Sequence, residues 1–186
     1  MGRPKNFNRA EVLEKAMPLF WKRGFADTGL QDIEKATGVN KSGLYSEFSN
    51  KDDLFLESLR HYDETRKGPL LLSREPLGWD NIEAFMKRLI TKEGPKGCFA
   101  VNTMREMELL PPEAQKLLVQ RRSRLKLLFL KNVEAEKPAA DPGALTEILS
   151  TFFSGLCIEQ NLKAGKTQIQ KREEKVEDFM KVLRSL

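Results

Sequence analysis

The chain has 186 residues, 40% of them hydrophobic and 32% charged, with a net charge of +5 and a pI near 9.2. This size and apolar content suffice for a buried core in one large or two small domains. No apolar run approaches the roughly 18 to 20 residues that cross a bilayer, so we expect a cytoplasmic protein without a membrane partner. Basic and acidic residues are nearly balanced in residues 1–67 and in 68–186, so the net charge alone does not identify a nucleic-acid partner.

The two cysteines and the single histidine show no recognisable metal-binding pattern. Cys98 and Cys157 lie far apart in the sequence, and His61 stands alone. This spacing matches neither a zinc site nor a CxxC motif, and a cytosolic protein keeps its thiols reduced. We therefore expect no metal site and no other cofactor.

Capping residues mark the first two helices. Asn8 followed by Glu11 has the spacing of an N-cap with its reciprocal partner, and apolar residues then recur every three or four positions until Gly24. Thr28 and Gln31 repeat the capping spacing before a shorter helix. The sequence thus predicts a helix of about four turns followed by a short one.

A helix-turn-helix is predicted over about residues 28–48. Gly38 can take the left-handed conformation of a sharp turn, and a third segment over about residues 41–48 follows within three residues. Its apolar residues share one side: Val39, Leu44 and Phe48. This pattern predicts that one side is anchored and the opposite side is free to contact DNA.

The opposite side of this third segment has few charged and no aliphatic residues. It presents Asn40, Lys41, Ser42, Gly43, Tyr45 and Ser46. Small residues let a helix enter a major groove about 12 Å wide, where Asn40 and Lys41 can contact base edges or phosphates and Tyr45 can donate to a phosphate. The alternative is a solvated face of a small bundle, but such a face more often has Glu and Lys pairs.

The remaining helices suggest two regions. Asn50 can cap a fourth helix, which ends before Gly68-Pro69, and we place the boundary there, giving regions 1–67 and 68–186. After an irregular connector, the second region shows helical segments over about 79–93, from near Gly97, over 112–136, from Asp141-Pro142 to near Gly165, and at the C-terminus. The predicted architecture is all-α with about nine helices in total.

The span from Asn6 to about Leu59 resembles the DNA-binding domain of the TetR family of bacterial transcriptional repressors. That family has a first helix ending in Phe and Gly, a Thr to Ile segment, and a Gly-Val pair followed at fixed spacing by Leu-Tyr, Phe, Lys and Leu. The matching segments here are Phe20 to Phe25, Thr28 to Ile33, and Gly38 to Leu54. The resemblance implies a regulator that binds double-stranded operator DNA through the helix-turn-helix.

The same resemblance implies individual DNA contacts. The groove-facing residues would be Asn40, Lys41, Ser42, Gly43 and Ser46. The residues that hold the phosphate backbone would be Thr28, Tyr45 and Lys51. One position departs from the pattern, since Glu34 stands where the family usually has Ala, and a buried carboxylate without a partner is costly. We therefore expect Glu34 to tilt outward.

The N-terminal Gly-Arg-Pro-Lys segment is a second candidate contact. Its extended, basic character suits an arm that lays Arg3 into a narrow minor groove, with Lys5 close by. The alternative is a disordered tail whose charges only raise nonspecific affinity.

A regulator that reads the two half-sites of a palindromic operator needs a dimer, so we expect a homodimer. The last two helices are the candidates, because apolar residues between Leu145 and Leu162 cover more than one stripe. The predicted interface residues are Ile148, Phe152, Leu156, Val176, Phe179 and Leu183. The alternative is the core of a monomer.

The family resemblance also implies a pocket in the second region for a small-molecule effector. The candidate lining residues are Phe85, Met86, Cys98, Phe99, Asn102, Met104, Met107, Phe153 and Cys157. Core packing is the alternative for all of them, since Met and Phe at helical spacing often fill cores. For the two cysteines, sensing of a soft metal ion or an electrophile competes with a role as small buried side chains.

The basic run from Gln120 to Lys131 also has two interpretations. A membrane surface or a second nucleic-acid patch is one. The other is a helix with Leu125, Leu128 and Phe129 on its buried side and a solvated face of Arg and Lys residues. We favour the solvated face.

These patterns predict a homodimeric, ligand-responsive repressor, in which an effector shifts the population away from the DNA-competent spacing of the two recognition helices. A small helical enzyme is the rival from another class, but one histidine, no Ser-His-Asp arrangement and no phosphate loop argue against it. A helical protein-interaction module without sequence-specific DNA binding is the alternative, and only the exposed side of the third helix speaks against it.

Overall fold

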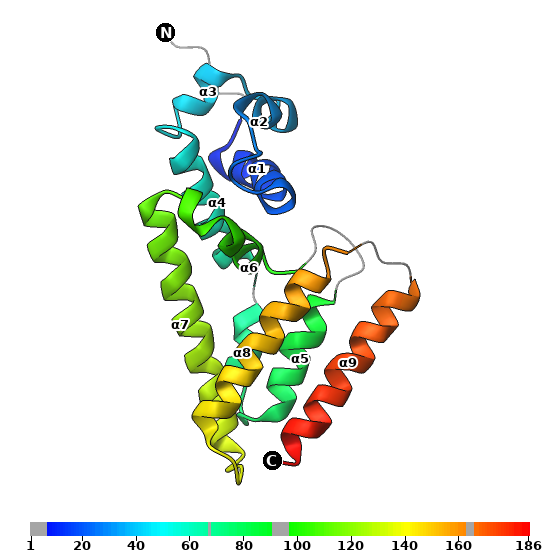
Figure 1. Cartoon of the computed structure of the whole chain (residues 1–186). Coiled ribbons are helices and arrows are strands. Elements are labelled where there is room, and N and C mark those ends of the chain that lie inside the picture. Colours follow the sequence, from blue (N-terminus) through cyan, green and yellow to red (C-terminus); the bar gives the residue numbers. More distant parts are fainter. Residues whose placement is uncertain (1–6, 67, 91–96, 163–165) are drawn as a thin grey trace.

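The computed structural model describes residues 7–66, 68–90, 97–162 and 166–186 (Figure 1). Within these ranges the chain is all-helical, as predicted, with nine α-helices and two 3-10 helices. They are α1 (Arg9–Arg23), α2 (Leu30–Thr37), α3 (Lys41–Tyr45), α4 (Lys51–Thr65), η1 (Gly68–Ser73), α5 (Trp79–Leu89), α6 (Phe99–Thr103), η2 (Met104–Leu109), α7 (Pro112–Ala135), α8 (Pro142–Glu159) and α9 (Lys166–Arg184).

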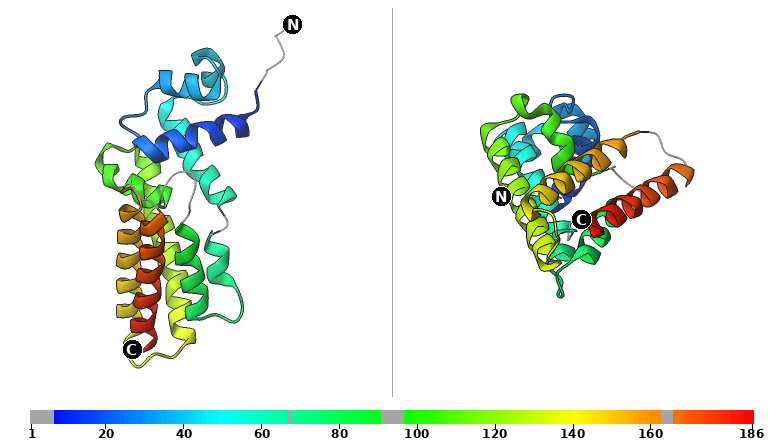
Figure 2. Two further views of the ribbon diagram at one scale, coloured as in Figure 1. Left: turned by 90° about the vertical axis from the view of Figure 1, so that its right-hand side faces the viewer. Right: turned by 60° about the horizontal axis from the view of Figure 1, so that its bottom comes forward.

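The molecule is elongated, with the short helices α2 and α3 at one end and the C-terminus at the other. The helices α5, α7, α8 and α9 run alongside one another over the lower part of the molecule in Figures 1 and 2. The short α6 lies between this bundle and the N-terminal helices, and it contacts α1, α4 and α8. Helices α4 and α6 thus connect the bundle to the N-terminal helices, since α4 also contacts α7.

Two of the predicted helix starts are confirmed and one is shifted. The side chains of Asn8 and Asn50 cap α1 and α4 by accepting from backbone N–H groups at 2.9 Å. The predicted capping pair of Thr28 and Gln31 is wrong by one residue. The N-cap of α2 is Gly29, whose N–H donates to Asp32 Oδ2 at 3.2 Å, because the side chain of Thr28 is turned into the core.

The second region follows the predicted order with different ends. The connector expected to be irregular contains the 3-10 helix η1, whose Leu72 is buried. Helix α8 ends at Glu159, short of Gly165, and α5 ends at Leu89. Gly97 has φ +72°, and a Cβ atom there would lie 2.4 Å from the Cys157 carbonyl oxygen, so only glycine allows this close approach to α8.

An aromatic cluster joins the N-terminal helices to α6. The Phe99 ring stacks on Trp21 with centroids 5.8 Å apart and meets Tyr62 edge-on at 5.7 Å. Phe55 meets Phe99 edge-on at 6.1 Å and also packs against Phe20. These contacts place α6 against α1 and α4, because aromatic pairs at such distances add to the stabilisation from burial.

Candidate DNA-binding surface and ligand cavity

The turn between α2 and α3 is fixed by hydrogen bonds as well as by glycine. Gly38 takes the left-handed conformation with φ +74°, as its sequence position predicts. The Thr37 hydroxyl donates to the Ile33 carbonyl at 2.7 Å and accepts from the Val39 N–H at 3.2 Å. Val39, Leu44 and Phe48 are all buried, so the predicted anchored side of the third segment is confirmed.

Helix α3 is shorter than the sequence suggested, and its N-terminus is capped from two sides. Asn40 Oδ1 accepts from the Gly43 N–H at 2.9 Å. The Glu34 carboxylate accepts from the Lys41 N–H, so this residue does tilt outward and finds a backbone partner there. The departure at Glu34 thus helps to set the start of α3.

The outer side of the third segment is exposed at the end of the molecule farthest from the C-terminus (Figure 1). Its exposed residues are Asn40, Lys41, Ser42, Tyr45 and Ser46. The Lys41 ammonium lies 5.8 Å from the centroid of the Tyr45 ring, and the Ser46 hydroxyl donates to the Gly43 carbonyl. The surface offers an ammonium, an amide, hydroxyls and a phenol, all groups that bind phosphates or base edges.

Three of the residues predicted to contact DNA have structural roles here. Gly43 is half-buried, and a Cβ atom would lie 2.7 Å from Val39 Cγ1 and 3.2 Å from Phe7 Cε1. Thr28 is fully buried, and its hydroxyl donates to the Gly24 carbonyl at 2.6 Å, so a phosphate contact by this hydroxyl does not fit the structure.

Lys51 is the third. Its Nζ donates to the carbonyls of Phe25 and Thr28 at 2.9 and 3.3 Å and lies over the Phe25 ring. These bonds hold the loop between α1 and α2, which is a role the sequence did not indicate. The predicted arm residues Arg3 and Lys5 lie outside the described residues.

A cavity of about 530 Å³ lies between the N-terminal helices and the bundle. Its wall includes four of the predicted pocket residues, namely Phe85, Cys98, Met104 and Phe153. Four others belong to the buried core instead: Met86, Phe99, Asn102 and Cys157. Met107 lines a second hollow of about 410 Å³ between η2 and α7.

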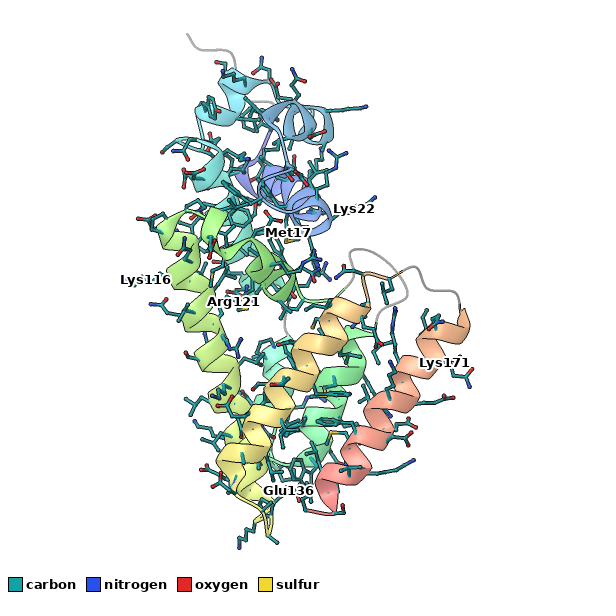
Figure 3. The ribbon with its side chains drawn as sticks, viewed as in Figure 1. Met17, Lys22, Lys116, Arg121, Glu136 and Lys171 are labelled. Atoms are coloured by element: carbon teal, nitrogen blue, oxygen red, sulfur yellow. The ribbon has the colours of Figure 1, made fainter. Side chains whose placement is uncertain are left out.

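Sequence reasoning missed the polar part of the cavity wall, which comes from α4 and α7. Tyr62, Asp63 and Arg121 line the cavity together (Figure 3 labels Arg121). Arg121 forms an ion pair with Asp63, and its guanidinium lies 5.1 Å from the centroid of the Tyr62 ring. The interpretation of Arg121 as part of a solvated face is therefore wrong. The sequence could have indicated this position, because Arg121 lies four residues before Leu125 and therefore shares its side of α7.

The two cysteines differ in their surroundings. Cys98 lies at the cavity wall and accepts a hydrogen bond from the Tyr62 hydroxyl at 3.6 Å. Burial raises the pKa of Tyr62 well above its ordinary value, so the phenol keeps its proton for this bond. Burial likewise raises the pKa of the Cys157 thiol well above its ordinary value. Cys157 is thus an unreactive core side chain.

No group of three or more His, Cys, Asp or Glu side chains in the described part of the chain is arranged to hold a metal ion. In the same residues, no helix has both the length and the apolar character needed to cross a membrane.

Helix α8 has a line of exposed residues along one side. Ile148 and Ile158 are 48% and 44% exposed, and nothing lies within 4 Å of the Cβ position of the exposed Gly155 between them. Leu162, just past the end of α8, is 65% exposed. Phe152 stacks on Phe179 of α9 with centroids 3.7 Å apart. Three other residues predicted at the interface are buried within the chain itself, so they cannot form it: Leu156, Val176 and Leu183.

A helix-turn-helix with an exposed polar second helix, joined through α4 and α6 to a helical bundle, is the arrangement of a helix-turn-helix transcriptional regulator. Residues 12–58 match the family described as bacterial regulatory proteins, tetR family. The HTH-type transcriptional repressor ComR of Escherichia coli K12 is 31% identical over 170 residues, covering 84% of this chain and 81% of ComR. The repressor BdcR of the same strain is 25% identical, covering 83% and 80%.

Solved structures agree with this assignment at the level of the fold. The regulator CifR, as a cysteine mutant in complex with 26-base-pair operator DNA, has a TM-score of 0.82 at 23% identity, covering 97% of this chain and 98% of CifR. Reduced NemR of E. coli has a TM-score of 0.74 at 20% identity, covering 95% of each chain. The chain belongs to the TetR family of helix-turn-helix transcriptional regulators. It is a DNA-binding regulator and not an enzyme.

Proposed function

We propose that this protein is a homodimeric repressor that leaves its operator when a small molecule enters the cavity. The observation that carries this proposal is the position of the cavity, whose wall includes Tyr62 and Asp63 of α4 together with Cys98 and Met104 next to α6. Because α4 also packs against α1 of the N-terminal helices, a ligand that displaces α4 or α6 would reposition α3. The operator-bound form would then be depleted by a ligand that binds the other conformation better.

The dimer proposal uses the exposed line on α8. Ile148, Gly155 and Ile158 recur on α8 at spacings of seven and three residues, which is typical of a helix that packs against a partner helix, and the exposed Leu162 follows just past its end. The stacked pair of Phe152 and Phe179 extends this surface to α9. A self-complementary pairing of this kind would set two α3 helices at a fixed separation for two half-sites.

The DNA contacts are proposed from the exposed side of the third segment. Asn40 and Lys41 would contact base edges, while Tyr45 would donate to a phosphate and Ser42 and Ser46 would line the groove. Changing Tyr45 to Phe should weaken binding to all sequences alike. Changing Asn40 or Lys41 should alter the sequence preference.

The experiment is fluorescence anisotropy of the purified protein on duplexes that tile the DNA upstream of its own gene. Between about 50 and 200 mM salt, six to ten phosphate contacts change the affinity by about 10³ to 10⁵. We expect tight, salt-dependent binding to one roughly palindromic duplex. Weak and equal binding to every duplex would contradict a specific regulator at this locus and would favour the protein-interaction module.

A further inference from the structure

Positive charge predominates on the cavity wall. Six Arg or Lys side chains line the cavity, four of them on α7, against the two carboxylates of Asp63 and Glu64; one of the six, Lys126, also pairs with Glu147. A hollow with low-dielectric walls and one predominant sign of charge concentrates ligands of the opposite sign. The wall therefore favours an anion over a cation.

Arg121 has an unused hydrogen-bond donor in this wall. Its Nη2 atom pairs with Asp63, while its Nη1 atom is buried and has no hydrogen-bond partner among the described residues. A buried donor without a partner is destabilising, because it has lost its hydrogen bonds to water. The planar guanidinium fork fits a carboxylate through two parallel bonds, and Asp63 occupies only one side of it. A small rotation of the guanidinium toward the cavity would let a ligand oxygen satisfy the other.

Asp63 is the carboxylate that pairs with this arginine. Burial raises the pKa of its carboxyl group, although the charges of Arg121 and Arg124 act in the opposite direction. Burial thus offsets part of the stabilisation that the ionised Asp63 gains from the two arginines. A carboxylate that arrives with the ligand can share Arg121 or replace Asp63 on it.

The other end of the cavity is apolar. Phe85, Phe129 and Phe153 line it and contact one another with ring centroids 5.5 to 6.0 Å apart. Phe129 lies eight residues after Arg121 on α7, with Leu125 and Leu128 between them on the cavity wall. At 1.5 Å per residue, the anionic and apolar ends are separated by about 12 Å along the helix.

We propose that the cavity binds an amphipathic carboxylate, with its head on Arg121 and its apolar body extending toward the three phenylalanines. The inference rests on the proposed ligand-responsive function and names the chemical class of the effector. A medium-chain alkanoate has the length and the polarity that this arrangement requires.

The test is isothermal titration of the full-length protein with decanoate, 1-decanol and decylamine, which share one alkyl chain and differ in the charge of the head group. We expect decanoate to bind about tenfold or more tightly than the other two, because a hydrogen-bonded charge pair is gained. Equal binding of decanoate and decanol would overturn the inference.

Variants identify the arginine that is responsible. Arg121→Gln should remove the preference for decanoate and leave decanol binding unchanged. Asp63→Asn should tighten decanoate binding, since it removes the competing carboxylate, and a gain in affinity cannot come from misfolding. Lys116→Gln is the matched control, because Lys116 is exposed on α7 and outside the cavity wall, and it should change neither (Figure 3). A preference for decanoate that persists in Arg121→Gln would overturn the inference.

A second measurement separates this inference from the proposed function. Operator anisotropy is repeated with saturating decanoate on wild type and Arg121→Gln. Release from the operator in the wild type but not in Arg121→Gln supports both proposals. Arg121-dependent binding of decanoate without operator release supports the ligand class and contradicts release by such a ligand.

Discussion

Glu106 and Ala26 join the N-terminal helices to the segment that lines the cavity. The Glu106 carboxylate accepts a hydrogen bond from the Ala26 N–H at 2.9 Å across 80 residues of sequence. It occupies space that Gly24 leaves free, since a Cβ atom on Gly24 would lie 1.7 Å from Glu106 Oε1. Because Met104 of the same segment lines the cavity, this contact is a direct connection between the cavity and the loop that precedes α2.

We expect Glu106→Ala to lower the free energy of unfolding by about 1 kcal/mol through loss of this hydrogen bond. Gly24→Ala should cost about 1–3 kcal/mol, because φ is +92° and the new methyl group meets the carboxylate. In the double variant the steric conflict is gone. Its loss of unfolding free energy should therefore be smaller than the sum of the losses in the two single variants. Urea denaturation of the wild type, the two single variants and the double variant measures these free energies, with the exposed Glu108→Ala as the control. Strict additivity would contradict the contact.

Gly43 should be required for packing of α3. An alanine in a helix is ordinarily more stable than glycine by about 0.5–1 kcal/mol, but here its methyl group would lie 2.7 Å from Val39 Cγ1. We expect Gly43→Ala to destabilise the protein by about 1–3 kcal/mol as an overpacked site. Ser42→Ala, at the exposed neighbouring position, is the matched control in the same thermal denaturation experiment. A stabilised Gly43→Ala protein would show that α3 is free to shift.

The exposed line on α8 predicts a specific effect on assembly. Ile158→Glu should produce monomers, because a charge placed in an apolar interface remains without a partner. Its fold should persist, since Ile158 is 44% exposed within the chain. Leu127→Glu, at a residue of α7 that is 52% exposed, should leave the assembly unchanged. Sedimentation velocity distinguishes the two, and an unaltered mass for Ile158→Glu would contradict the α8 interface.

We expect the ion pairs of Glu83, where α5 meets α9, to contribute to stability in a pH-dependent way. It pairs with Lys87 at 2.9 Å and with Arg184 at 3.0 Å, and the hydrogen bond from Lys87 lowers its pKa below the ordinary value of 4.5. The stabilisation is therefore complete above pH 4.5 and is lost as the pH falls through the lower folded-state pKa. For partly exposed pairs it amounts to about 0.2–1 kcal/mol.

The measurement for Glu83 is urea unfolding of wild type and Glu83→Gln over a range of pH. The difference between the two should be present near neutrality and should shrink in acid. Glu173→Gln, an exposed position on α9, controls for the loss of a negative charge. A difference that does not change in acid would show that Glu83 acts through packing and not through its charge.

Cys157 should resist alkylation in the folded protein. Its thiol is fully buried and burial raises its pKa, so very little of the reactive thiolate is present near neutral pH. We expect iodoacetamide to leave Cys157 unmodified in native protein and to modify it fully in denaturant, as read by peptide mass spectrometry. Cys157→Ser provides the blank for that peptide. Rapid native modification of Cys157 would restore the hypothesis that this thiol senses electrophiles.

The local features of this protein were determined by its sequence. The caps at Asn8 and Asn50, the left-handed Gly38 and the buried side formed by Val39, Leu44 and Phe48 all depend on residues within a few positions of one another. Capping and helical periodicity act over that range, so these features can be derived from the order of residues alone. The all-helical class and the helix-turn-helix follow from them.

The tertiary structure decided which side of each helix meets another helix. The apolar stripes of the last two helices indicated burial, but they did not show that Leu156, Val176 and Leu183 face the chain's own core while Ile148 stays exposed. The burial of the Thr28 hydroxyl could not be foreseen for the same reason, because its side chain enters the core of the N-terminal helices.

The cavity and its chemistry also belong to the tertiary structure. The ion pair of Asp63 with Arg121 and the contact of Glu106 with Ala26 each join residues that are far apart in the sequence. Periodicity gives the faces of a helix but not the partner of each face, since the partner depends on crossing angles and on the packing of all helices together. The folded chain alone therefore places a cationic, aromatic-lined hollow beside the helices that bind DNA.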